Sequence, residues 1–132
     1  MMRMSAEELD PEDQWPLPPA WMWDCAECIR RYEAMKHVQA VIAGLTAEDP
    51  GVDWDVTDSI VATQINLSRH IADAHREALP DWDDTCGTCA DHRTTLERTG
   101  RRTPDLLPGA VMAAEEHRAR HLFAPPRVVG LL

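Results

Sequence analysis

Two residue types that bind metals recur in this chain in a repeated order. The chain has 132 residues and only four cysteines, which form two CxxC pairs, and a closely spaced pair of histidines follows each CxxC. The two sets are Cys25, Cys28, His70 and His75, and Cys86, Cys89, His117 and His121. The Cys and His pairs are 41 residues apart in the first set and 27 apart in the second. The pattern indicates an internal repeat whose second copy has a shorter middle.

Zinc fits these donors. Two thiolates at about 2.3 Å and two imidazoles at about 2.0 Å complete its tetrahedral shell. His117 and His121 are four residues apart and share a helix face. His70 and His75 are five apart, about 140° around an ideal helix, so the helix must loosen or tighten for both rings to reach one ion. We therefore expect two zinc ions per chain, each held by one set.

The cysteines leave one serious alternative. CxxC followed by CxxC is itself a metal signature, so all four cysteines could form one shared site for zinc or an iron–sulfur cluster. That arrangement would leave four histidines in matched positions without a role. A dithiol oxidoreductase would need a βαβ setting, which the sequence lacks. His37 and His92 lie outside the repeat, and we interpret them as surface groups or neighbours of the metal ligands.

The motifs do not favour catalysis. A shell of two cysteines and two histidines has no open position for water or substrate. The phrase "HRARH" has Arg118 where the zinc-protease motif HExxH has its glutamate. Phosphate-binding glycine loops, nucleophile elbows and deaminase motifs are also missing. The expectation is a protein that is not an enzyme.

The elements that must position the ligands read as helices. Apolar residues recur at steps of three and four after Cys28, and this helix should end at "EDPG" near residue 50. A second helix is expected over 57–79, with Ile60, Leu67, Ile71, Ala74 and Ala78 buried along one stripe. A third should follow Cys89 and stop at Gly100, and a fourth should cover 110–122 before Pro125 and Pro126.

These helices predict an all-α fold of two small, zinc-stapled helical hairpins packed together. The first module should span 25–80 and the second 81–124, preceded by an acidic Pro/Trp-rich arm over 1–24 and followed by a tail over 125–132. Modules of this size have thin cores, which usually need a metal or a disulfide. The start of the chain has no secretory signal pattern, and no stretch approaches the ~18 apolar residues of a membrane span. We therefore expect a cytoplasmic protein that does not enter a membrane, in which paired cysteines serve metal rather than disulfides.

Charge separates two classes of partner. Residues 1–85 hold 18 acids against six Lys and Arg, a formal charge of −12, whereas residues 86–132 hold five against seven, a charge of +2. The acidic part would repel phosphate backbones. We therefore expect a regulatory module that binds a protein partner through aromatic anchors in the arm, namely Trp15, Trp21 and Trp23.

The alternative is a nucleic-acid-binding, transcription-regulator-like protein that uses the basic second half. Its phosphate contacts would come from Arg93, Arg98, Arg101, Arg102, Arg118 and Arg120. A DNA-reading finger, however, has about twelve residues between its Cys and His pairs and a ββα fold. The intervals of 41 and 27 residues do not fit that geometry.

Overall fold

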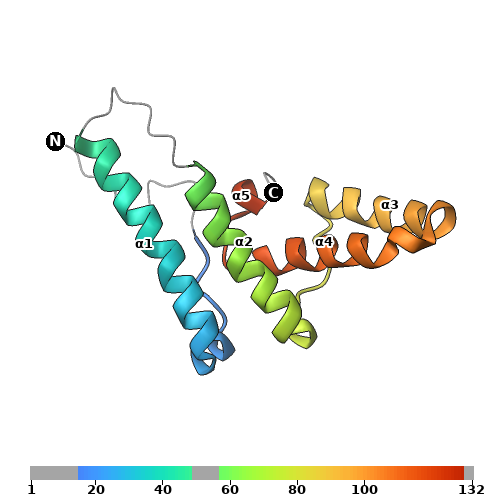
Figure 1. Cartoon of the computed structure of the whole chain (residues 1–132), viewed down its shortest axis with the longest axis horizontal. Coiled ribbons are helices and arrows are strands. Elements are labelled where there is room, and N and C mark those ends of the chain that lie inside the picture. The colour runs from blue at the N-terminus through green and yellow to red at the C-terminus, as the bar shows by residue number, and fades with distance from the viewer. Residues whose placement is uncertain (1–14, 49–56, 130–132) are drawn as a thin grey trace.

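The protein is all-helical in the part of the chain described by the computed structural model, residues 15–48 and 57–129 (Figure 1). The α-helices are α1 (Ala26–Glu48), α2 (Thr57–Ala74), α3 (Gly87–Arg102), α4 (Leu107–Arg120) and α5 (Pro126–Val129). Three short 3-10 turns join them: η3 (Ala20–Asp24), η4 (Arg76–Ala78) and η5 (Pro104–Leu106). The expected all-α fold is confirmed.

The helices form two antiparallel hairpins. Figure 1 shows α1 beside α2, and α3 beside α4, with the two members of each pair running in opposite directions. The hairpins join through α2 and α4, which pack against each other. Each hairpin therefore brings the start of its first helix next to the end of its second. The expected pair of packed hairpins is confirmed.

The second expected helix was too long. The α-helix ends at Ala74, because His75 leaves the helical conformation with φ −130° and ψ 39°. The chain continues as the η4 turn before Pro80, and the residue preceding a proline disfavours the helical conformation. Leu67 and Ile71 are buried as expected, but Ala74 is exposed. The stripe therefore follows only the part of the segment that stays helical.

The end of α3 and the start of α4 also differ from the predicted positions. The α3 helix continues through Gly100 to Arg102, because a glycine weakens a helix without breaking it. The α4 helix begins at Leu107 rather than at residue 110, and Pro108 stands in its first turn. Proline is tolerated there because the first N–H groups of a helix have no partner within it.

One hydrophobic core serves both hairpins. Its buried members come from η3, α1, α2, the end of α4 and the segment that follows: Met22, Cys28, Met35, Leu67, Ile71, Ala119, Phe123, Ala124 and Val129. The chain leaves α4 at Arg120 and carries Phe123 and Val129, which are 1% and 0% exposed, into this cluster. The described part of the segment after residue 124 is therefore built into the core. Within the described ranges, no helix combines the length and apolarity needed to cross a membrane.

Candidate metal centres

The antiparallel hairpins bring together the residues that the sequence repeat singled out. In each hairpin the CxxC pair lies at the start of the first helix and the His pair at the end of the second. The first cluster contains Cys25, Cys28, His70 and His75, and the second contains Cys86, Cys89, His117 and His121. Within each cluster the four ligand atoms lie within 4.8 Å of one another. The cysteines are free thiols in two separate pairs, so the alternative of one shared four-cysteine site is wrong.

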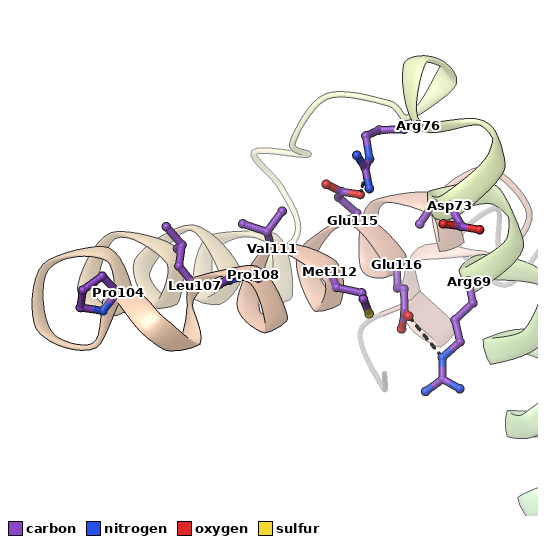
Figure 2. Close-up of a pocket in the computed structure, with 11 residues that line it drawn as sticks. Arg69, Asp73, Arg76, Pro104, Leu107, Pro108, Val111, Met112, Glu115 and Glu116 are labelled. Carbon is purple, nitrogen blue, oxygen red and sulfur yellow. Dashed lines mark hydrogen bonds and ion pairs between the residues drawn. The ribbon is translucent and has the colours of Figure 1, made fainter.

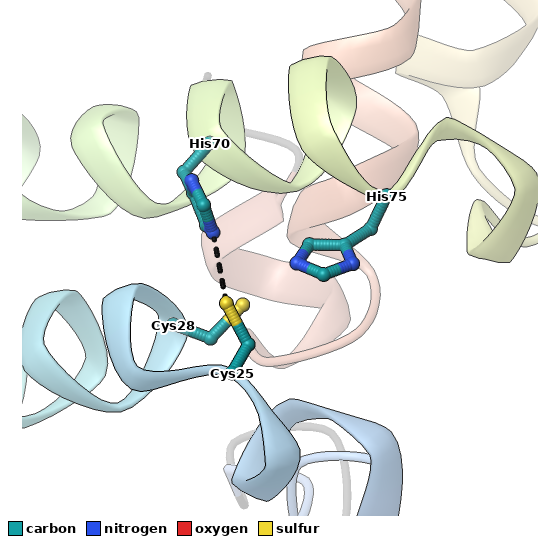
Figure 3. A group of neighbouring side chains, drawn as sticks. All are labelled: Cys25, Cys28, His70 and His75. Carbon is teal, nitrogen blue, oxygen red and sulfur yellow. Dashed lines mark hydrogen bonds between the residues drawn. The ribbon is translucent and has the colours of Figure 1, made fainter.

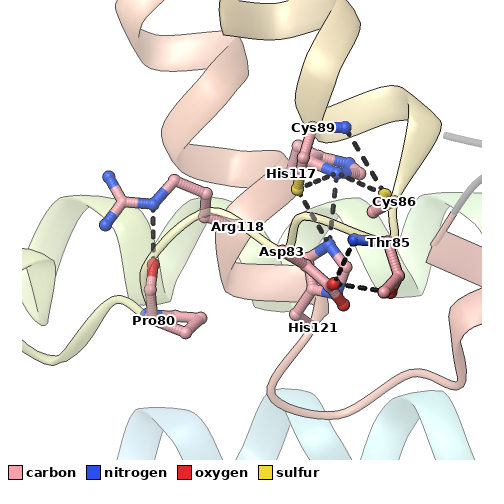
Figure 4. A network of polar contacts seen from close by, with 8 residues as sticks. All are labelled: Pro80, Asp83, Thr85, Cys86, Cys89, His117, Arg118 and His121. Carbon is pink, nitrogen blue, oxygen red and sulfur yellow. Dashed lines mark hydrogen bonds and ion pairs between the residues drawn. The ribbon is translucent and has the colours of Figure 1, made fainter.

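The second cluster has the dimensions of a tetrahedral metal site (Figure 4). The Nε2 atom of His117 lies 3.5 Å from the sulfur of Cys86 and 3.3 Å from that of Cys89. The Nε2 atom of His121 lies 3.3 Å from Cys89 Sγ and 3.3 Å from His117 Nε2. A tetrahedral zinc ion spaces sulfur and nitrogen donors by about 3.5 Å and two nitrogen donors by about 3.3 Å. The four donors are therefore arranged at the spacing that zinc requires.

A carboxylate and a third imidazole lie behind the histidines of the second cluster. The Nδ1 atom of His121 lies 4.0 Å from a carboxylate oxygen of Asp83. This carboxylate accepts hydrogen bonds from the backbone N–H of Thr85 at 2.8 Å and from its hydroxyl at 2.6 Å, and these bonds lower the pKa of Asp83. The ring of His92 lies 5.0 Å from that of His117, which is fully buried. A carboxylate behind a metal-binding histidine fixes the ring and makes it a better ligand.

The segment leading into the second CxxC is held by Arg118. Its Nε donates a 2.7 Å hydrogen bond to the backbone oxygen of Pro80, and its guanidinium lies 5.3 Å above the ring of Trp82. This side chain thus ties α4 to the segment that carries Asp83 and Cys86.

The first cluster is less regular (Figure 3). Cys25 Sγ lies 3.5 Å from His70 Nε2, and Cys28 is fully buried. The rings of His70 and His75 are 5.2 Å apart. His75 adopts the non-helical backbone that ends α2, as the five-residue spacing of the His pair predicts. Its Nε2 atom is buried without a hydrogen-bond partner, and a bound metal ion would satisfy such an atom.

The two cysteines of the first cluster differ in their acidity. The backbone N–H of Cys28, with help from the two histidines, lowers the pKa of Cys25 from 9.0 to about 6. Burial raises the pKa of Cys28 to about 12. In the second cluster, the N–H of Cys89 donates to Cys86 Sγ at 3.4 Å, and burial raises the pKa of Cys89. The first cysteine of each pair therefore has a backbone donor, whereas burial opposes ionisation of the second, and a bound cation would favour its thiolate.

The two clusters could each hold a metal ion, and the donor types fit zinc. Two thiolates and two imidazoles in tetrahedral positions suit zinc better than the hard cations, which prefer oxygen ligands. The buried Nε2 of His75 and the donor spacing of the second cluster both fit this ion. When bound, zinc would fasten the start of one helix to the end of its neighbour.

The aromatic residues expected to bind a partner mostly pack inside the molecule. Trp15 and Trp21 are half-buried against the core, and Trp15 also lies 5.3 Å from the ammonium of Lys36. The ring of Trp21 lies 4.8 Å from that of His75. Trp23 is 48% exposed and makes an edge contact with Tyr32. Of the three, Trp23 presents the largest aromatic surface to solvent.

The expected phosphate-binding arginines do not form one surface. Arg120 is buried, with 6% of its surface exposed, and Arg118 is engaged with Pro80 and Trp82. The remaining four are exposed along α3 and at its end: Arg93, Arg98, Arg101 and Arg102.

Asp83 is a candidate functional residue that the sequence did not reveal. It precedes Cys86 by three residues within a run of acids, and nothing in its spacing distinguishes it from Asp81 and Asp84. His92, which we interpreted as a surface group or a neighbour of the ligands, lies against His117.

No protein-family model matches this chain, and no curated protein or solved structure is significantly similar to it.

Proposed function

We propose that this protein is a small cytoplasmic zinc-binding module in which two structural zinc ions stabilise a helical scaffold for binding another protein, without catalysis. The observation that carries the zinc assignment is the second cluster, whose sulfur and nitrogen donors lie 3.3–3.5 Å apart, as around a tetrahedral zinc ion. All four donors come from the protein, so the ion has no open position for a reacting group.

Metal analysis tests this assignment. Protein purified without added metal should contain two zinc ions per chain. His70→Ala and His117→Ala should each lose one, whereas His37→Ala should keep both, because His37 is exposed and belongs to neither cluster. One zinc per chain in the wild-type protein, or iron with visible absorbance, would refute the two-zinc assignment.

A groove between α2 and α4 is the surface best suited to a protein partner (Figure 2). It has a volume of about 610 Å³, and its floor includes Leu107, Val111 and Met112. Met112 is 62% exposed, which is unusual for a large apolar side chain. The groove therefore offers apolar surface for which the described chain provides no cover.

Charge on the rim of the groove indicates the kind of partner. Arg69 bonds Glu116 at 3.2 Å and Arg76 bonds Glu115 at 2.9 Å. The arginine side chains are 64% and 69% exposed, whereas the two glutamates are only 13% and 14% exposed. Guanidinium groups therefore face solvent above the apolar floor, with Asp73 as the exposed acid between them. The lining thus holds two arginines against three acids, with the guanidinium groups more exposed than the glutamates, which favours an amphipathic segment that carries charges of both signs.

Variants of the groove test the partner. Met112→Glu places a charge on the floor, and Arg69→Glu with Arg76→Glu reverses the rim, so both should lose a partner captured by the wild-type protein. Arg98→Glu with Arg102→Glu on α3 is the control for the rim variant, because this pair makes the same charge change outside the groove. All variants must retain zinc and helix content. A synthetic peptide of the captured segment should then bind directly, and unchanged binding by both groove variants would refute this surface.

Nucleic acid is the second candidate, favoured by the exposed arginines of α3. Binding through Arg93, Arg98, Arg101 and Arg102 should weaken by orders of magnitude between about 50 and 200 mM salt. Fluorescence anisotropy with labelled duplex DNA measures this dependence. Loss of binding in the Arg101→Ala, Arg102→Ala double variant would support DNA binding over a protein partner.

A further inference from the structure

The histidines of the two clusters lie on backbone of different regularity. His117 lies in the last turn of α4, and His121 caps it with φ −61° and ψ −19°, which continues the helical conformation. Both rings therefore stand on rigid helix. His75 lies beyond the end of α2, on a residue with φ −130° and ψ 39°. Its ring is held by a less regular segment.

The donor atoms are also more closely and evenly spaced in the second cluster than in the first. In the second cluster each histidine Nε2 lies 3.3 Å from the sulfur of Cys89 and from the other Nε2. In the first, Cys25 and His70 are 3.5 Å apart and the four donors lie within 4.8 Å of one another, but His75 Nε2 makes no hydrogen bond among the described residues. Metal binding at the first cluster must therefore draw His75 toward the sulfurs, whereas the second cluster needs little movement.

Outer contacts widen the difference. His121 has the carboxylate of Asp83 at 4.0 Å, a charge contact longer than a hydrogen bond, and Thr85 fixes this carboxylate. The Nδ1 atom of His117 is buried without a hydrogen-bond partner in the part of the chain that the structure describes, so His121 alone has a carboxylate behind it in this cluster. The ring that lies against His75 is that of Trp21, which supplies no negative charge. Two of the four donors are buried in the second cluster and one in the first. Outer partners of this kind change metal affinity by about 10- to 100-fold.

We infer that the two centres hold zinc unequally: the second is the permanent structural centre, and the first exchanges its metal at concentrations that leave the second filled. The inference rests on the proposed zinc function. On the difference in outer partners we expect an affinity difference of about 10- to 100-fold.

Exchange at the first centre would act on η3. Cys25 directly follows η3, and its N–H bonds the backbone oxygen of Met22 at 3.2 Å. Trp21, in the same turn, packs on His75. A zinc ion shared by Cys25 and His75 thus fastens η3 to the end of α2. Loss of this ion releases η3 and exposes Trp21, so the first centre couples metal availability to the surface around Trp21.

Graded chelation of the zinc-loaded protein tests the order of release. Native mass spectrometry identifies the stage with one zinc per chain, and brief alkylation with iodoacetamide then shows which cysteines are free. The comparison is between Cys25 and Cys86, which are both half-buried. Each alkylation rate is divided by the rate of the same cysteine in metal-free protein, because the lowered pKa of Cys25 raises its own reactivity. Preferential alkylation of Cys25 is expected. Equal alkylation, or alkylation of Cys86 first, would overturn the inference, whereas purified protein without zinc would refute the proposed function before this step.

Two variants test the cause and the consequence. Asp83→Asn should lower the chelator concentration that empties the second centre by about tenfold or more, while Asp84→Asn, a neighbouring and 94% exposed carboxylate, should leave it unchanged. Loss of the first zinc should change tryptophan fluorescence in the wild-type protein, and Trp21→Phe should abolish most of this change. A change of equal size in the Trp21→Phe variant would refute coupling to the surface around Trp21.

Discussion

Replacing Phe123 by alanine should destabilise the whole molecule, including the cluster encoded in the first half of the sequence. Phe123 follows α4, is 1% exposed, and lies in the core with Met22, Cys28 and Leu67. Truncation of a buried phenylalanine typically costs about 3–5 kcal/mol, because the lost apolar contact is combined with a cavity. We expect a cost in the upper part of this range of about 3–5 kcal/mol. The side chains around Phe123 belong to separate elements, which cannot all move to fill the cavity.

Urea unfolding of the zinc-loaded protein, followed by circular dichroism, measures the loss. Leu106→Ala is the matched control, because Leu106 is 65% exposed and its truncation should cost well under 1 kcal/mol. The wild-type protein should unfold in one transition, since one core serves both hairpins, and Cys25 should become reactive to alkylation in that same transition. A loss below about 1 kcal/mol in Phe123→Ala, or separate transitions for the two hairpins in the wild-type protein, would refute the shared core.

Three further perturbations probe the helices, the charges and the buried histidine. Gly100→Ala should stabilise the protein by about 0.5–1 kcal/mol in thermal unfolding, because Gly100 is helical and an added Cβ would meet nothing within 4 Å; destabilisation would contradict the open surrounding. Arg76→Ala should cost no more than about 1 kcal/mol in urea unfolding, because the ion pair of Arg76 with Glu115 is at the surface, and a larger loss would assign the pair a structural role. Stability should fall as the pH is lowered from about 6.5 to about 4, because burial lowers the pKa of His117 from 6.5 to about 4. In this range the unfolded chain takes up a proton at His117 that the folded protein does not. Equal urea midpoints at pH 7 and pH 5 would contradict this.

The sequence predicted the two clusters because the information needed was local. A CxxC turn, a His pair and two amphipathic helices suffice to place Cys86 near His117, once the helices form a hairpin with antiparallel arms. The five-residue spacing of His70 and His75 predicted a distortion of the helix but not its location. The helix ends after Ala74, and this position depends on where the His75 ring meets the cysteines.

Long-range packing was beyond such reasoning. The prolines at 125 and 126 correctly indicated the end of α4, but periodicity carries no signal for where the chain goes next. The burial of Phe123 and Val129 depends on contacts with core residues from elements that are distant in sequence. Asp83 was missed for the same reason, because its role depends on its position behind His121 and not on its neighbours in the chain.

Each hairpin has its metal-binding residues at one end and the link between its two helices at the other. The length of a hairpin is therefore independent of the geometry of its metal cluster. The first hairpin is built from helices of 23 and 18 residues, and the second from helices of 16 and 14. At 1.5 Å per residue, their longer helices extend about 34 Å and about 24 Å. Whole turns can be added or removed at the far end without moving a single ligand atom. The two hairpins therefore extend to different lengths from their metal-binding ends. The length of either hairpin can change in evolution without altering the residues that bind its metal.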